Sequence, residues 1–177
     1  NYPLTLIGVD INKAARISTR KKLNNINTDC IIINGNISDP HELNSKLNTE
    51  YGIHLNDYLN CRTFLDHNRI FRFPKTKGYG TIQTTGVFAY KGDIIKKNLL
   101  INNLIEHLRE WKKYVNKHGL LLLELHTIDP QLSSKYRGDT LACSYDSTHG
   151  LSDQYLVEFD TFIKCAQTAG LELSKES

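Results

Sequence analysis

Several features are absent from the 177-residue sequence, and their absence limits the classes of protein to consider. The longest apolar block, Leu120–Leu123 with Leu125 beyond Glu124, is far shorter than the roughly 20 residues that a membrane-spanning helix needs. The 22 Lys and Arg residues nearly balance the 19 Asp and Glu residues, so charge does not favour nucleic acid as a partner. The four cysteines include no Cys-x-x-Cys pair, which argues against a zinc ribbon or a disulfide framework. We therefore expect a soluble, cytoplasmic protein with buried, reduced thiols that binds neither membrane nor nucleic acid.

Two motifs of nucleotide-binding proteins are also missing. The sequence contains no GxGxxG turn and no phosphate-binding P-loop. It also contains no methionine, and its length suits a single domain, or most of one, over residues 1–177. We therefore expect a chain that belongs to a larger polypeptide, in which the strand and glycine-rich turn for the other half of such a ligand lie outside this sequence.

The sequence alternates short apolar runs with amphipathic segments, as α/β folds do. We predict four strands, the last of them the most buried, within Pro3–Val9, Asp29–Asn34, Asp57–Arg69 and Leu120–Leu125. We predict helices after Asp10, over His41–Tyr51 with Ser38 or Asp39 as the cap, over Asp93–Lys117, and from Leu151 or Ser152 to Gly170. The segments Phe71–Phe88 and Thr127–Gly150 show no period, and the first could close over a site as a lid.

Strands that alternate with helices favour a parallel sheet, because each parallel neighbour needs a crossover connection. The predicted fold class is therefore α/β, with a doubly wound, Rossmann-like, mostly parallel sheet. We expect this sheet to be incomplete, with the glycine-motif strand and the last strands outside the chain.

An acid and an amide follow the first two predicted strands. Asp10 ends the first strand, and Asn36 comes just beyond the second. In a Rossmann-like sheet an acid in this place can accept hydrogen bonds from both hydroxyls of a ribose, and the residue after the next strand can reach an adenine edge. The two residues fit an adenosine-containing ligand; equally, Asp10 could cap its own helix.

The stretch Asp57–Arg69 passes without a gap from an apolar run into Asp66-His67-Asn68-Arg69. Open α/β sheets bind ligands at the carboxyl ends of their strands, so these four residues are candidates for a site. The alternative is a polar turn after a strand.

Three histidines, His67, His126 and His149, lie at ends of predicted elements along one edge of the sheet, and Asp66 and Gln154 supply oxygens nearby. Two imidazoles with a carboxylate or amide oxygen suit a first-row divalent ion with open positions, iron or manganese rather than a closed zinc site. Such an ion can act as a Lewis acid on a carbonyl. The alternative is that each histidine hydrogen-bonds within a polar loop.

Together, the segments LIGVDIN, IIINGNISDP, NCRTFLDHNR, KHGLLLLEL and STHGLSDQYLVEFDTFIKCAQTAGL resemble the class I S-adenosylmethionine-dependent methyltransferases. More narrowly, they are similar to the methyltransferase domains of bacterial polyketide synthases, including the metal-dependent kind of the apratoxin pathway. The resemblance spans nearly the whole chain. It implies carbon methylation of an acyl group bound to an acyl carrier protein, with neighbouring synthase domains as further partners.

The resemblance also implies roles for individual residues. It implies that Asp10 binds the ribose hydroxyls of S-adenosylmethionine, that Asn36 and Ile37 lie beside the adenine, and that Arg62 and Phe64 lie near the methionine part. It further implies a mononuclear metal ion on His149 and Gln154, with Asp66 or His67 as the third ligand. We expect His67, with Asp66 and His149, to form the catalytic group, since a carbon nucleophile requires a base and an oxyanion stabiliser.

Two other readings remain open. The chain could be a non-catalytic methyltransferase-like module that serves as a structural spacer or docking surface in a megasynthase. It could also be a fragment of a nucleotide-binding oxidoreductase, for which Asp10 is the main support and the missing glycine turn the main objection.

Overall fold

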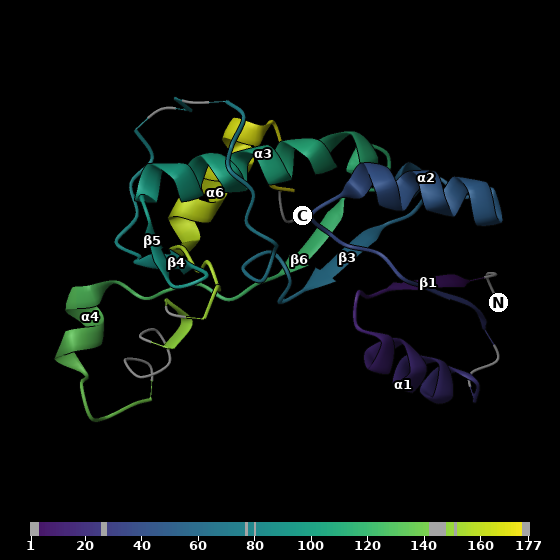
Figure 1. Cartoon of the computed structure of the whole chain (residues 1–177), viewed down its shortest axis with the longest axis horizontal. Helices are drawn as coiled ribbons and strands as arrows, with labels where there is room; N and C mark the ends of the chain where they lie inside the picture. The colour runs from purple at the N-terminus through teal and green to yellow at the C-terminus, as the bar shows by residue number, and fades with distance from the viewer. Residues whose placement is uncertain are drawn as a thin grey trace. The chain divides into compact units, whose positions relative to one another are not determined.

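The computed structural model of the chain describes residues 4–25, 28–76, 78–79, 81–141, 148–150 and 152–174 (Figure 1). The chain forms two compact units, Asn1–Ile53 and His54–Ser177. Each unit is a mixture of helices and strands whose main strand pair is parallel, which is compatible with a Rossmann-like fold. Within the described ranges, none of the helices combines the length and the apolar character needed to cross a bilayer.

The first unit is a β-α-β-α segment. Strand β1 (Thr5–Val9) and strand β2 (Asp29–Ile33) pair in parallel, with Thr5 opposite Asp29 and Val9 opposite Ile33. Helix α1 (Lys13–Leu23) supplies the crossover that this pairing requires, and helix α2 (Pro40–Tyr51) follows β2. The core of this unit is small; its buried apolar side chains are Ile32, Ile33, Leu43 and Leu47.

Both helices of the first unit begin at side-chain caps. Asp39 accepts a hydrogen bond from the Glu42 N–H and Pro40 takes the first helical position, which confirms that part of the prediction. In α1 the cap is Asn12, which accepts from the N–H groups of Ala14 and Ala15. Asp10 therefore does not cap α1. It lies two residues before the cap, directly after β1.

The second unit contains a parallel pair, a hairpin and two long helices. Strand β3 (Asn60–Thr63), after the 3-10 turn η1 (Leu55–Asp57), pairs with β6 (Leu120–Leu123). Between them come the antiparallel strands β4 (Phe88–Tyr90) and β5 (Asp93–Ile95) and helix α3 (Lys97–Val115). After β6 come helix α4 (Pro130–Lys135) and, further along the chain, helix α6 (Phe159–Ala169).

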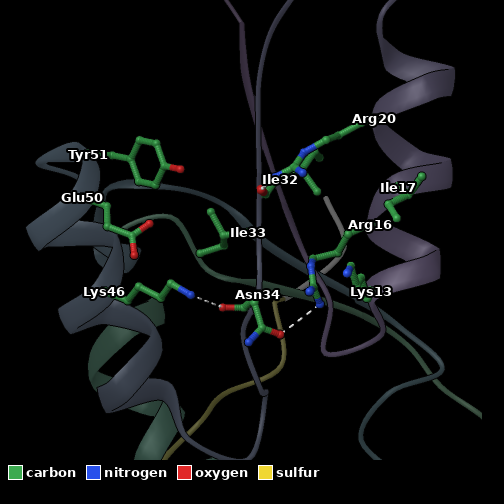
Figure 2. Close-up of a pocket in the computed structure, with 10 residues that line it drawn as sticks. All are labelled: Lys13, Arg16, Ile17, Arg20, Ile32, Ile33, Asn34, Lys46, Glu50 and Tyr51. Carbon is green, nitrogen blue, oxygen red and sulfur yellow. Dashed lines mark hydrogen bonds between the residues drawn. The ribbon is translucent and has the colours of Figure 1, made fainter.

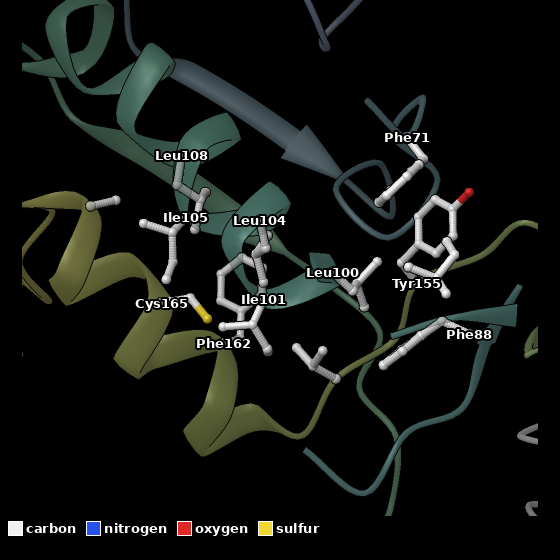
Figure 3. Packing of buried hydrophobic residues seen from close by; sticks show 13 residues of the cluster. Phe71, Phe88, Leu100, Ile101, Leu104, Ile105, Leu108, Tyr155, Phe162 and Cys165 are labelled. Atoms are coloured by element: carbon white, nitrogen blue, oxygen red, sulfur yellow. The ribbon is translucent and has the colours of Figure 1, made fainter. Parts of the chain in front are cut away.

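The core of the second unit lies where α3 packs against α6 (Figure 1, Figure 3). Helix α3 presents Leu100, Ile101, Leu104, Ile105 and Leu108, all at most 3% exposed, at the spacing of one helical face. The partners from α6 and from the chain around it are Phe162, Cys165, Ala169, Phe88 and Tyr155. Burial raises the pKa of the Cys165 thiol to about 12, so this cysteine is a core filler. Cys61, by contrast, is exposed, unlike the buried thiols we expected.

Three predicted elements differ from the structure. The helix predicted from Asp93 begins only at Lys97, because Asp93–Ile95 forms the second strand of the hairpin. The helix predicted from Leu151 or Ser152 begins at Phe159; Leu151 itself lies outside the described residues. Strand β6 is not the most buried strand, since Leu121 and Leu123 are 61% and 56% exposed while their neighbours are half-buried.

The predicted lid, Phe71–Phe88, is irregular up to Phe88, and carboxylates of the helical region hold its described part in place. Glu106 of α3 accepts hydrogen bonds from the N–H groups of Lys75 and Thr76. Glu158, the residue before α6, accepts from the Thr84 hydroxyl at 2.8 Å and from the Thr85 N–H at 2.6 Å. These two anchors fix where the segment leaves and rejoins the core; closure over a site stays a prediction.

Candidate functional site

Glu124 and His67 form the best-defined polar contact of the second unit. His67 follows β3 and Glu124 follows β6, and the carboxyl ends of adjacent parallel strands lie at one edge of a sheet. The His67 Nδ1 lies 2.5 Å from Glu124 Oε1, and both side chains are only 4% exposed. The other oxygen, Oε2, accepts from the N–H groups of Asp66 at 2.6 Å and of His67 at 3.2 Å.

This environment keeps Glu124 ionised. Burial alone would raise its pKa, but the hydrogen bonds from the His67 ring and the Leu125 N–H outweigh burial and hold the pKa of Glu124 below its usual value. A carboxylate can only accept hydrogen bonds, so Nδ1 of His67 carries the shared proton. The opposite ring nitrogen, Nε2, is then left to accept a proton or to bind a metal.

The ring of His149 lies next to the ring of His67. The rings of His67 and His149 meet edge to face with centroids 6.3 Å apart. The Tyr155 N–H donates to the His67 carbonyl at 2.8 Å, so the backbone next to Gln154 passes His67; binding of a ligand by the Gln154 side chain stays a prediction. Gln154 belongs to an extended segment before α6 and not to a helix start. His126 faces elsewhere, with its ring against Phe159 and Phe162.

Asp66 lies in a buried charge cluster rather than in an open site. Its Oδ1 accepts from Arg62 at 3.1 Å and from His107 Nε2 at 2.9 Å, and the side chains of all three residues are at most 5% exposed. The Arg62 guanidinium also stacks on the Trp111 ring at 4.6 Å. Arg69 donates to the Asp66 backbone carbonyl at 2.8 Å and is itself buried.

The cluster sets the charges of its members. Burial alone would raise the pKa of Asp66, but Arg62 and the hydrogen bond from His107 lower it to about 2. Burial lowers the pKa of His107 to about 4 against the pull of Asp66, so His107 is neutral at physiological pH. Asp66 and Arg62 thus contact each other and side chains of α3. Direct contact of either residue with substrate or cofactor stays a prediction.

Phe64 is the remaining candidate on the second unit. It follows β3 directly, its N–H donates to the Leu123 carbonyl at 2.7 Å, and its side chain is 42% exposed. Its φ of +56° lies in the left-handed region, which is unfavourable for a phenylalanine. Such backbone strain concentrates at functional sites, so an exposed aromatic ring held in this way suits a ligand contact.

The first unit carries the other candidates. The Asp10 N–H donates to the Ile33 carbonyl at 3.3 Å, so Asp10 lies where β1 and β2 both end. Its carboxylate is exposed apart from one oxygen that accepts from the Asn12 N–H at 2.7 Å. Asn36 accepts from the Ser38 N–H at 2.9 Å and forms the turn before α2 together with half-buried Ile37. An exposed acid and an amide turn therefore share this strand edge.

A hollow of about 290 Å³ lies between α1, β2 and α2, and basic side chains of both helices line it (Figure 2). Arg20 donates to the Ile32 carbonyl at 2.6 Å, Lys46 donates to the Asn34 carbonyl at 3.1 Å, and Arg16 donates to the Asn34 side chain at 2.9 Å. These cations satisfy carbonyl groups of β2 and of the residue after it. These hydrogen bonds tie both helices to the chain at the end of β2.

Neither Glu124 nor His107 is among the candidates singled out from the sequence. Asp66 and His67 were candidates because they are ionisable residues at the end of a predicted strand. Glu124 meets the same criterion, since it follows a run of four leucines. His107 carried no such signal. It lies on the apolar face of α3, and only the fold shows that this face meets Asp66.

A mixed α/β fold with parallel strands, an acid at the end of β1 and a buried histidine–carboxylate pair at another strand end suit a methyltransferase of the Rossmann-like class. The family model described as "AprA MT2-like domain" matches residues 1–177. The chain therefore belongs to the AprA MT2-like methyltransferase domains, and this family implies methyl transfer from S-adenosylmethionine. No curated relative matches the chain.

The buried cluster predicts an acid-sensitive fold. The folded-state pKa of His107 is about 4 and its ordinary value is 6.5, so the unfolded chain takes up the proton first and stability falls between pH 6.5 and 4. Asp66, with a pKa of about 2 against 3.8, contributes stability that is present above pH 4 and is lost towards pH 2. We expect each group to account for about 2–3 kcal/mol of the free energy of unfolding.

The pH dependence of denaturant unfolding checks this prediction. In His107→Gln the decline between pH 6.5 and 4 should shrink, while the decline below pH 4 should remain. An unchanged decline in the upper window would show that His107 is already accessible to protons in the folded state.

Proposed function

We propose that this domain methylates a carbon atom of an acyl group bound to an acyl carrier protein, in polyketide biosynthesis, with S-adenosylmethionine as the methyl donor. The observation that carries the proposal is the buried His67–Glu124 pair. Methylation of oxygen or nitrogen often needs little help from a base, whereas a carbon next to a carbonyl must first lose a proton. A histidine whose Nδ1 is held by a carboxylate is a base built for that step. The carrier and the polyketide setting are supported by the motifs that resemble synthase domains.

The first unit fits the cofactor by the chemistry of its exposed groups. Asp10 offers a carboxylate at the end of β1, where two ribose hydroxyls could donate to it, and Asn36 with Ile37 offers an amide and an apolar side chain for an adenine. Among the described residues β1 pairs with β2 alone, which leaves one edge of β1 open. A strand from polypeptide outside residues 1–177 would complete a doubly wound sheet there and bring the missing glycine-rich turn.

In the proposed reaction, the chain's residues handle the proton and the charge. S-adenosylmethionine supplies, when bound, a methyl group activated on a sulfonium and leaves as S-adenosylhomocysteine. Nε2 of His67 takes the proton from the carbon beside the thioester carbonyl, and Glu124 stabilises the resulting imidazolium through Nδ1. His149, edge to face with His67, borders the same place and can donate a hydrogen bond to the developing enolate oxygen. Arg62, Asp66 and His107 hold the turn that carries His67.

A divalent metal ion, iron or manganese, is the second component we propose. Among the described residues no group of three His, Cys, Asp or Glu side chains could hold an ion, so the donors would be His67, His149 and the amide oxygen of Gln154. Glu124 would then orient the His67 ring through its hydrogen bond to Nδ1, without binding the ion itself. The ion would polarise the carbonyl as a Lewis acid. Binding the ion would occupy Nε2, so His67 serves either as base or as ligand.

Binding of S-adenosylhomocysteine tests the cofactor assignment. We expect Asp10→Ala to weaken binding at least tenfold, because two hydrogen bonds to a carboxylate are lost. Asp29→Ala is the control, since Asp29 is an exposed acid at the opposite end of β2. Calorimetry on the full-length protein measures both. No binding by the unaltered protein would favour the non-catalytic structural or docking module, and equal losses in both variants would remove Asp10 from the site.

Methyl-transfer rates test the base. We expect His67→Ala to lower the rate about 10²- to 10⁴-fold, as loss of a general base does, and Glu124→Gln to lower it about 10- to 100-fold. S-adenosylhomocysteine affinity should not change in either variant. His118→Ala, at an exposed histidine after α3, should keep the full rate. A normal rate in His67→Ala would contradict the proposal.

Metal content separates the two roles of His67. If an ion is bound, protein purified without chelator should contain about one equivalent, His149→Ala should lose it, and His118→Ala should retain it. Elemental analysis gives the answer directly. Equal metal content in the unaltered protein and in His149→Ala would remove His149 from the site, and no metal in either would assign Nε2 to proton transfer.

A further inference from the structure

The hollow of the first unit carries more positive than negative charge (Figure 2). Lys13, Arg16 and Arg20 line it from α1. Lys46 lines it from α2, together with Glu50, the only acid among the described residues of the lining. None of the four cations forms an ion pair with a described carboxylate. Like charges that share one hollow repel each other, so a bound anion would relieve that repulsion.

Three of these cations are held in place by the chain at the end of β2. Arg20 donates to the Ile32 carbonyl at 2.6 Å. Figure 2 shows that Arg16 and Lys46 reach Asn34 from the two helices; Arg16 donates to its side chain at 2.9 Å and Lys46 to its backbone carbonyl at 3.1 Å. One residue thus fixes a cation from each helix. A ligand meets side chains that are already ordered, which lowers the entropic cost of binding.

The same side chains keep N–H donors that a ligand can use. A guanidinium has five donors, yet Arg16 donates to described residues only through Nη1, and Arg20 only through Nη2. Lys46 donates once, and Lys13 donates to no described residue. Guanidinium and ammonium groups bind phosphate oxygens strongly, and a guanidinium does so through two parallel hydrogen bonds. The chemistry of the donors therefore favours a phosphate-bearing ligand.

The size of the hollow favours a small ligand over a polymer. Its volume of about 290 Å³ lies at the lower end of the roughly 300–1,000 Å³ typical of small-ligand sites. Ile32 and Ile33, which are 7% and 4% exposed, line it from β2. Tyr51 of α2 belongs to the same lining and is 46% exposed, so its ring offers a surface on which a flat base can stack.

We propose that this hollow binds a diphosphate group, either free or as the end of a nucleotide. Arg16 and Arg20 donate to the phosphate oxygens through the guanidinium nitrogens that they do not use within the fold. Lys13 and Lys46 supply the remaining positive charge, so that four cations face a ligand with several negative charges. The site is separate from the methyl transfer proposed above and does not depend on it.

Calorimetric titration of the full-length protein with inorganic pyrophosphate tests the inference. The titration is done without divalent metal ions and at constant ionic strength, so that a saturable signal reports a defined site. We expect Lys13→Glu to weaken binding at least tenfold, because the substitution turns an attraction into a repulsion. No saturable binding by the unaltered protein would overturn the inference.

Lys22→Glu is the matched control for Lys13→Glu. It changes the net charge of the protein equally and lies on the same helix, at an exposed lysine outside the lining. Lys22 comes two residues after Arg20, and two residues turn an α-helix by about 200°, so it faces away from the hollow. We expect it to bind pyrophosphate normally. Equal losses in the two variants would show that net charge alone attracts the anion, and would contradict a defined site.

Substitutions of Lys46 test the contribution of α2. Lys46→Gln keeps an N–H donor for the Asn34 carbonyl but removes the charge, and should weaken pyrophosphate binding about fivefold. Lys46→Arg keeps the charge and should retain most of the affinity. The midpoints of denaturant unfolding should be the same for both variants. An equal loss of affinity in both would contradict the role of charge at this position.

Nucleotides distinguish the two sources of a diphosphate group. AMP, with a single phosphate, should bind at least tenfold more weakly than ADP. Tighter binding of ADP than of pyrophosphate, with the gain removed by Tyr51→Ala, would assign the site to a nucleoside diphosphate. Equal binding of ADP and pyrophosphate would assign it to free diphosphate. Equal affinities for AMP, ADP and pyrophosphate would contradict recognition of a diphosphate.

Discussion

The carboxylate of Glu124 is the interaction on which the site depends. It gathers the backbone N–H groups of Asp66, His67 and Leu125 and the ring of His67, and so joins the turn after β3 to the end of β6. Three backbone donors hold the carboxylate at a fixed place, and the fixed carboxylate sets the orientation and tautomer of the imidazole. The Glu124 carboxylate thus connects the ends of β3 and β6 and orients the His67 ring that we propose as the base.

A second buried group explains why the turn is rigid. Arg62, Asp66, His107 and Arg69 are ionisable residues inside a unit whose remaining core is apolar. The Nε and Nη2 atoms of Arg62 and the Oδ2 atom of Asp66 have no hydrogen-bond partner among the described residues. Apolar residues of similar volume would stabilise the fold as well or better, because the free-energy cost of removing charges from water offsets much of the attraction between them. Asp66 directly precedes His67 in the chain, so we infer that its partners hold the turn that carries His67.

The sequence predicted those parts of the fold that a local pattern specifies. The parallel pairs followed from apolar runs separated by helical segments, and the α2 cap followed from Asp39 and Pro40. The hairpin was missed because Ile94 and Ile95 match the helical period of α3, while its turn depends on left-handed φ angles at Lys91 and Gly92. The exposed leucines of β6 could not be foreseen, since burial of a strand depends on which neighbours cover it.

The same limit applies to the site. His67, His126 and His149 were predicted to lie together from their places at element ends; the structure brings the rings of His67 and His149 together and packs His126 against Phe159 and Phe162. The partners that give them their chemistry, Glu124 and the His107 cluster, come from segments about 40 to 60 residues away in sequence, and only the packing of α3 and β6 brings them close. The resemblance implied roles for Asp66 and Arg62 in ligand binding, and it did not reveal that the two side chains pair with each other.

The protonation of the His67 ring is the most direct measure of the central claim, that Glu124 prepares this histidine as a base. Two-bond ¹H–¹⁵N NMR spectra of the imidazole report which nitrogen carries the proton. The account predicts a ring that carries its proton at Nδ1 in the unaltered protein and a mixture of tautomers in Glu124→Ala. A ring protonated at Nε2, or the same tautomer in both proteins, would contradict it.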